Sequence, residues 1–263
     1  MKICVCASVF GNLHYFNTKQ NKVKNQQRLS PKNEKTDMDF YLFTNLTHDV
    51  LKSTIHEHWK VITVSDDDDF MKENNFRKDN NVNQVQKSRY FKFQLHKYFN
   101  GQYDFIIYLD HHIHLDPNVN WEDIASSVIN EATENNLALV QVRHKDGMDS
   151  VKREADLIIR CGVDSRININ KSLDYLDTIN NSVDIGEKII FRENWIFGYC
   201  PKHKETVEHF DIFWGHYLNE KYATRRDQPL WNFLFLARNK RSKMMNLLKF
   251  TTNKTNWVNR CNI

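Results

Sequence analysis

Glycine and proline are scarce in this sequence. Its 263 residues include only 7 glycines and 4 prolines, and no long segment is low in complexity. Flexible linkers are usually rich in such residues, so we expect one domain rather than two joined units. The 17 phenylalanines, 10 tyrosines and 6 tryptophans can fill a large core. The domain is predicted to span residues 1–240, and residues 241–263 are predicted to form a basic extension that packs on it or trails from it.

Cysteine is present without the pattern of a disulfide or zinc framework. The 5 cysteines are odd in number and lack zinc-finger spacing, so we expect reduced and mostly buried thiols. Cys4 and Cys6 lie two residues apart in an expected strand, which places them on the same face as core residues.

A long apolar run is also absent. A membrane-spanning helix needs about 18 or more apolar residues, and no stretch of the chain approaches that length. The apolar start of the chain resembles a short signal sequence, but Gly11 and Asn12 end it, which favours a first β-strand. We therefore expect a cytoplasmic protein without a membrane span.

Positive charge is not concentrated in one region. The net charge is +4, and the basic residues are scattered except at Arg225–Arg226 and around residues 238–243. Proteins that bind duplex nucleic acid usually carry a concentrated basic stripe. Nucleic acid is therefore not expected as a partner, whereas a local anion site is compatible with this balance. The oligomeric state is not indicated by the sequence.

Strand-like and helix-like segments alternate along the chain. Strands are predicted at residues 2–9, 39–44, 59–64, 105–110, 137–142 and 188–192, and helices at 83–99, 120–135, 151–159, 203–219 and 225–236. This alternation is typical of an α/β fold in which helices flank an open, Rossmann-type mixed sheet.

The most informative segment is the run from Phe105 to His114. An apolar strand ends there in one carboxylate, Asp110, and three histidines. In open α/β sheets, ligands bind beyond the carboxyl ends of the strands. Asp110 and His112 are two residues apart, so in extended backbone they project to the same side and can share a divalent cation. The alternative is a turn residue beside a solvated histidine cluster.

The predicted helix at 83–99 carries a basic stripe. Arg89, Lys92 and His96 follow a spacing of three and then four residues, which places them along one side of a helix. Such a stripe faces either an anion in a cleft or water. Polar residues also follow the strand at 137–142, where His144 stands, and we expect these clusters to converge on one rim.

Several segments taken together resemble a known family. They are Ala7–Gly11, Asp39–Thr44, Ser88–Lys92 with His96, Tyr108–Asp110 with Ile113, Arg143–His144 with Glu154, and Arg226–Gln228. In this order, over about residues 3 to 238, they resemble GT-A type glycosyltransferases, and most closely the DUF616 group. The resemblance implies a hexosyl- or pentosyltransferase that passes a sugar from a nucleotide-diphosphate sugar to a hydroxyl group of a glycan or other acceptor.

The resemblance also implies roles for individual residues. It implies that Asp110 and His112 are ligands of Mn²⁺ or Mg²⁺. The implied contacts to the donor are Arg89, Lys92, His96 and Asp110. The implied catalytic residues, which touch the sugar or the acceptor, are His144, Glu154 and Asp227. An inverting reaction needs a general base on the acceptor hydroxyl, and Asp227 or Glu154 is the candidate.

One departure from the pattern keeps the use of a metal open. Many GT-A enzymes carry Asp-x-Asp, whereas His112 stands here in place of the second aspartate. Two alternatives to a transferase remain. One is a metal-dependent hydrolase that uses Asp110 with the neighbouring histidines and His144, although adjacent histidines of a strand point to opposite faces. The other is a non-catalytic module that binds a nucleotide or carbohydrate.

Overall fold

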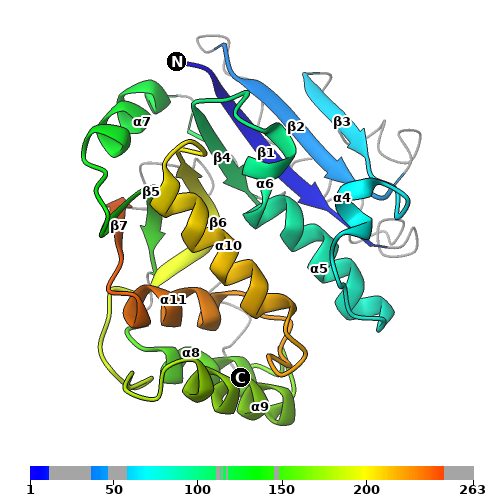
Figure 1. The fold of residues 1–263 in the computed structure, drawn as a ribbon, viewed down its shortest axis with the longest axis vertical. Coiled ribbons are helices and arrows are strands. Elements are labelled where there is room, and N and C mark those ends of the chain that lie inside the picture. Colours follow the sequence, from blue (N-terminus) through cyan, green and yellow to red (C-terminus); the bar gives the residue numbers. More distant parts are fainter. Residues whose placement is uncertain are drawn as a thin grey trace.

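A mixed sheet of seven strands forms the centre of the molecule. The computed structural model describes residues 1–11, 37–46, 58–110, 113, 115–116, 118–144 and 148–245. The strands are β1 (Ile3–Val9), β2 (Asp39–Thr44), β3 (Trp59–Thr63), β4 (Phe105–Leu109), β5 (Asn136–Arg143), β6 (Arg192–Tyr199) and β7 (Arg241–Met245). They lie in the order β3-β2-β1-β4-β6-β5-β7 (Figure 1).

The first four strands in this order are parallel, and one later strand reverses direction. β1 pairs in parallel with β2 and β4, and β2 pairs in parallel with β3. β6 runs antiparallel to both β4 and β5, and β7 is parallel to β5. The carboxyl ends of β1, β4 and β5 therefore point to the same edge of the sheet, where a ligand site is expected.

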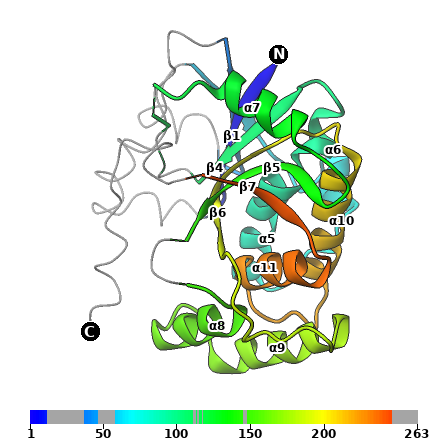
Figure 2. The same cartoon turned by 90° about the vertical axis from the view of Figure 1, so that its left-hand side faces the viewer.

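Burial explains why the central strands are apolar along their whole length. Every residue of β1 and β4 is buried, and strands covered on both faces lack the alternation of half-exposed strands. One face packs on the core shared with α5 (Asn80–Phe93), α6 (Leu95–Phe99), α10 (Lys204–Leu218) and α11 (Gln228–Ala237). The other face packs on α7 (Trp121–Asn130). Figure 2 shows α5, α6, α10 and α11 together on one side of the strands.

The remaining helices lie at the edges of this arrangement. α4 (Asp69–Lys72) is a single short turn at the acidic run of the sequence. α8 (Val151–Arg160) and α9 (Arg166–Ile179) pack on each other, and α8 also packs on α11 (Figure 1). None of the helices that the structure describes has the length and apolar character needed to cross a membrane.

Local signals confirm several of the predicted helix starts. Asn120 caps α7, and its side-chain oxygen accepts hydrogen bonds from the backbone N–H groups of Glu122 and Asp123 at 3.1 and 3.3 Å. Pro229 lies in the first turn of α11, where its missing N–H costs no helical hydrogen bond. The Asn100–Gly101 pair, a sequence typical of a turn, has positive φ at both residues.

Other predicted elements are wrong or incomplete. The strand predicted at 188–192 lies at 192–199, because the run from Ile196 to Tyr199 is fully buried and is the one that pairs with β4. The helix predicted at 83–99 is interrupted at Gln94, whose backbone is not helical and whose amide group donates to the carbonyl oxygens of Phe93 and Phe210. α9 and β7 are not among the predicted elements.

Two further expectations concern the C-terminal region and the cysteines. β7 continues the sheet beyond residue 240, where the basic extension is predicted to begin, and residues 246–263 lie outside the described part of the chain. Cys4 and Cys6 are fully buried free thiols on one face of β1, with their sulfur atoms 3.8 Å apart. Cys161 is disulfide-bonded, so the expectation of thiols throughout is wrong.

Candidate active site

The candidate site begins at Asp110, directly after β4. Its backbone N–H donates to the carbonyl oxygen of Trp195 on β6 at 2.7 Å, which continues the pairing of these strands. Its own carbonyl oxygen accepts from the N–H of Ile113 at 2.9 Å. The backbone on both sides of Asp110 is thus held, so that its carboxylate has a defined position at the carboxyl end of the sheet.

A chain of hydroxyl groups supports this carboxylate from the sheet. Tyr108 lies two residues before Asp110 and projects to the same face. Its hydroxyl donates to Oδ1 of Asp110 at 3.1 Å and lies 3.1 Å from Oγ of Ser8 on β1. The Ser8 hydroxyl in turn donates to the carbonyl oxygen of Ser88 on α5 at 3.0 Å. Two strands and one helix are therefore connected beneath the carboxylate.

Helix α5 supplies two cations to the same place, as the sequence predicts for Arg89 and Lys92. Nζ of Lys92 is 3.5 Å from Oδ1 of Asp110 and 3.2 Å from Oδ2 of Asp227. Nε of Arg89 is 3.4 Å from Oδ1 of Asp227. Asp227 precedes α11, so these ion pairs join three elements that are far apart in the sequence. The structure thus brings Arg89, Lys92, Asp110 and Asp227 into one cluster.

The electrostatics of Asp227 follow from its surroundings. Burial alone would raise the pKa of Asp227, but Arg89, Lys92 and Arg226 outweigh this effect and hold the pKa well below its usual range. Asn194 on β6 adds an amide contact to Oδ2 at 3.5 Å. Asp227 is therefore ionised near neutral pH and is held in place on several sides.

Glu154 is the second carboxylate whose pKa is strongly perturbed. It lies in the first turn of α8 and is 4% exposed. Burial raises the pKa of Glu154 to about 7; the charge of Arg226 opposes this shift and that of Asp227 adds to it. One of its carboxyl oxygens, Oε2, has no hydrogen-bond partner among the described residues. A carboxyl group with this pKa can take up or release a proton near neutral pH.

Unpaired polar atoms accumulate around Asp227. Besides Oε2 of Glu154, the buried atoms without a hydrogen-bond partner in the described part of the chain include Oδ1 of Asn194 and Nε of Arg226. Most buried polar atoms in folded proteins are hydrogen-bonded. These unsatisfied acceptors and donors therefore have hydrogen-bonding capacity left for a polar ligand.

His144 lies next to this cluster but has its own partners. Its Nε2 is 3.3 Å from Oε1 of Glu193, and the Gln228 amide donates to Oε2 of Glu193 at 3.4 Å. Because Gln228 follows Asp227 directly, the structure brings His144 to the start of α11. These contacts connect His144 to α11 through Glu193 and Gln228.

His96 is not part of the cluster, contrary to the prediction. Its Nε2 lies 3.1 Å from Oδ1 of Asp211 on α10, and its ring contacts Tyr199. Tyr199 pairs with Ile106 near the start of β4, whereas Asp110 follows the end of that strand. The break at Gln94 explains the error, because the spacing from Arg89 to His96 no longer lies along one continuous helix.

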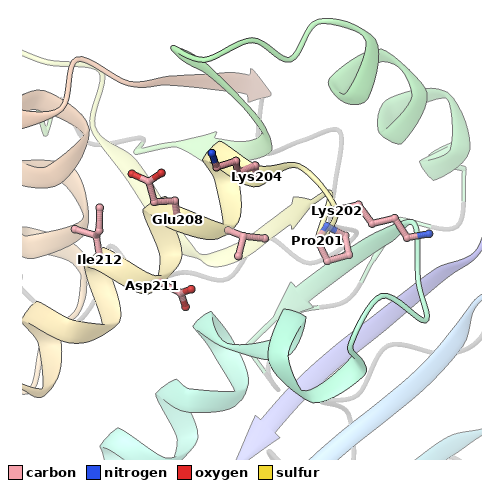
Figure 3. Close-up of a pocket in the computed structure, with 7 residues that line it drawn as sticks. Pro201, Lys202, Lys204, Glu208, Asp211 and Ile212 are labelled. Carbon is pink, nitrogen blue, oxygen red and sulfur yellow. The ribbon is translucent and has the colours of Figure 1, made fainter.

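A hollow on the outer face of α10 lies near this opposite end of β4. It has a volume of about 600 Å³ and is lined by Pro201, Lys202, Lys204, Val207, Glu208, Asp211 and Ile212 (Figure 3). Lys202 pairs with Asp104, which precedes β4, at 2.7 Å. Glu208 pairs with Arg238 at 2.5 Å. The hollow is thus a surface feature bordered by ion pairs and is separate from the Asp110 cluster.

The described residues do not form a complete metal site. His112 and its neighbours His111 and His114 lie outside the described part of the chain. Within that part, no three His, Cys, Asp or Glu side chains gather in a way that could hold a metal ion. Asp110 supplies one carboxylate, and its Oδ1 is already in contact with Lys92 and Tyr108. The predicted metal ligands Asp110 and His112 stay a prediction.

The arrangement of the whole chain is shared with a solved enzyme. The crystal structure of mouse xyloside xylosyltransferase 1 in its apo form matches with a TM-score of 0.53, over 93% of this chain and 85% of that chain, at 11% sequence identity. The chain has a GT-A-like glycosyltransferase fold. No protein-family profile and no curated protein matches the sequence. The finer resemblance to the DUF616 group therefore rests on the sequence motifs alone.

Three residues that contact this cluster are absent from the predicted set. Ser8 and Tyr108 lie inside apolar strands, although the two-residue alternation from Asp110 could have indicated Tyr108. Asn194 contacts Asp227, but the strand that carries it was predicted too early in the chain. Asn194 reaches the cluster because β6 lies between β4 and β5 in the sheet.

Proposed function

We propose that this protein is a glycosyltransferase that moves a sugar from a nucleotide-diphosphate sugar to a hydroxyl acceptor. The observation that carries the proposal is the buried cluster of Arg89, Lys92, Asp110 and Asp227 at the carboxyl end of the parallel strands. Ligands of open α/β sheets bind at this end. The glycosyltransferase-like fold supports the same function.

Arg89 is the proposed contact to the diphosphate. A nucleoside diphosphate leaves with negative charge, and fixed cations stabilise that charge in the transition state. The side chain of Arg89 is 20% exposed, so it reaches the surface of the cluster, and its planar guanidinium group suits phosphate oxygens. Asp110, whose side chain is 21% exposed, is the carboxylate that lies nearest to the bound donor in this proposal.

Glu154 is the proposed general base if the transfer inverts configuration. A base must be ionised to take the proton of the acceptor hydroxyl, and its pKa should lie close to the working pH. Burial raises the pKa of Glu154 to about 7, which meets this condition. Asp227 is a poorer base, because Arg89, Lys92 and Arg226 keep its pKa low against the effect of burial. Asp227 instead holds Arg89, and His144 is a proposed contact to the sugar or acceptor.

The test is nucleotide release from a panel of UDP-, GDP- and CMP-sugars, each with Mn²⁺, with Mg²⁺ and with chelator. We expect at least one donor to be hydrolysed or transferred, and the metal and chelator arms will show whether a divalent cation is required. Asp110→Asn should reduce turnover by about 10²–10³-fold, because an amide is a weaker ligand than a carboxylate for a divalent cation on the donor and forms no ion pair with Lys92.

Asp39→Asn is the matched control, since Asp39 lies at the opposite end of the strands and is paired with Lys60. It should leave turnover unchanged. Binding without turnover by the wild-type chain would indicate a nucleotide- or carbohydrate-binding module, and absence of both would contradict the proposal.

A further inference from the structure

Lys92 lies deeper in the cluster than its neighbours. Its side chain is 2% exposed, compared with 20% for Arg89 and 21% for Asp110. Its ammonium group lies 5.3 Å from the centre of the Tyr108 ring and 5.6 Å from that of Phe93. Aromatic rings and carboxylates thus surround the ammonium, and a ligand at the surface of the cluster meets Arg89 and Asp110 first.

The ammonium of Lys92 connects two parts of the site. It contacts Oδ1 of Asp110, the same oxygen that accepts the hydrogen bond of Tyr108, and it also contacts Oδ2 of Asp227. One cation therefore joins the end of β4 to the start of α11. Two carboxylates that share one ammonium repel each other when the ammonium is removed.

We propose that Lys92 is a positioning residue, which holds Asp110 and Asp227 in their working orientation from beneath while Arg89 contacts the donor diphosphate. This inference rests on the proposed function and assigns separate tasks to the two cations of α5. An anion that approached Lys92 would first meet the carboxylates of Asp110 and Asp227, which repel it. Preorganised charges of this kind act on the rate of the chemical step more than on the affinity of the substrate.

The experiment compares three methionine variants of α5 residues in the full chain. Lys92→Met removes the buried ammonium, Arg89→Met removes the more exposed guanidinium, and Lys87→Met serves as the control. Lys87 is also largely buried, with a side chain that is 8% exposed, but it pairs with Asp66, whose side chain is 80% exposed. Donor dissociation constants are measured by calorimetry and kcat by nucleotide release, with the donor found in the panel above.

The inference predicts a split between binding and turnover. Lys92→Met should lower kcat about 100-fold or more while the donor Kd stays within about threefold. Arg89→Met should raise the donor Kd about tenfold or more, because it removes a charged contact. Lys87→Met should change neither quantity. Lys92→Arg keeps the charge and should recover most of the lost turnover, with the donor Kd again unchanged.

A Kd in Lys92→Met that rises as much as in Arg89→Met would overturn the inference, because Lys92 would then touch the donor itself. Circular dichroism checks that each variant is folded. If Lys92→Met does not fold, Lys92→Arg decides the question in the same way, since a tenfold rise in its Kd contradicts the inference and an unchanged Kd supports it. Failure of the wild-type chain to bind any donor would overturn the proposed function together with this inference.

Discussion

The two ends of the parallel strands each carry a cluster of charged and phenolic groups, but the clusters are built differently. At the amino end, the Tyr103 hydroxyl donates to Asp39 at 2.7 Å, Lys60 pairs with Asp39 at 2.7 Å, and the hydroxyl groups of Tyr41 and Tyr103 are 2.7 Å apart. At the carboxyl end, the ion pairs of Asp110 and Asp227 have distances between 3.2 and 3.5 Å.

The clusters also differ in burial and in how fully their polar atoms are paired. The side chain of Lys60 is 57% exposed, whereas that of Lys92 is 2% exposed. Unpaired buried atoms surround Asp227, and none of the side chains of the amino-end cluster belongs to that group. Buried charges whose polar neighbours are incompletely hydrogen-bonded are characteristic of functional sites, whereas a cluster without unpaired buried polar atoms is typical of a structural role. This difference supports the proposed donor site at the carboxyl end.

The largest effect is expected when the ion pairs at the carboxyl end of the strands are broken. Asp227→Asn removes the carboxylate that pairs with Arg89 and leaves Lys92 with Asp110 alone, and removal of one partner from a buried pair typically costs about 3–5 kcal/mol of the free energy of unfolding. Asp39→Asn removes a half-exposed carboxylate and should cost no more than about 1 kcal/mol. Urea denaturation of both variants measures the two values. Equal losses would show that the two clusters do not differ in the way that their burial indicates.

The next effect concerns Glu154 and depends on pH. Burial raises the pKa of Glu154 from 4.5 to about 7, so the folded state binds a proton more tightly than the unfolded state. The resulting stabilisation is present below pH 4.5 and is lost as the pH rises through about 7. Glu154→Gln cannot ionise, so at pH 8 it should gain roughly 3 kcal/mol over the wild type, relative to their difference at low pH.

Denaturation of the wild type and Glu154→Gln at several pH values tests this expectation. A difference in unfolding free energy that does not change with pH would contradict the raised pKa. The same residue gives a kinetic result, since kcat/KM should rise with pH through about 7 in the wild type. Glu154→Gln should have little turnover at any pH if Glu154 is the base.

The smallest expected effect compares two tyrosines that each donate a hydrogen bond to an aspartate. Tyr108→Phe removes the bond to Asp110, and Tyr103→Phe removes the bond to Asp39. Each variant should lose about 1 kcal/mol of the free energy of unfolding. Only Tyr108→Phe should also lose turnover, because only Asp110 lies in the proposed donor site. Equal turnover in the two variants would remove the functional distinction between the ends of the strands.

Much of the framework that carries the site could be predicted from local sequence. The strand before Asp110, the N-cap at Asn120 and the turn at Asn100–Gly101 follow from patterns within a few residues. Arg89 and Lys92 lie on one side of α5 because their spacing of three residues is preserved in that helix. The resemblance added Asp227 and Glu154, which no local pattern connects to Asp110.

The errors arise where contacts between distant segments decide the structure. Gln94 interrupts the predicted helix, and one of the carbonyl groups it contacts, that of Phe210, belongs to α10. This break turns His96 away from Arg89 and towards Asp211. The apolar residues that precede β6 have a strand-like pattern, and so do the residues within β6. Only the residues within β6 pair with β4, and this pairing decides which segment is the strand. Neither outcome is encoded in the neighbouring residues alone.

The sequence by itself determined that a buried strand ends in Asp110 and that two cations precede it on a helix, because strand and helix periodicity depend on residues close along the chain. Only the tertiary structure decided that Lys92 lies between Asp110 and Asp227 and that Glu154 is buried near Arg226. Burial and charge interactions depend on which distant segments meet. They set the pKa values and the exposed fractions of the side chains, on which the proposed roles of Arg89 as donor contact and Lys92 as positioning residue rest.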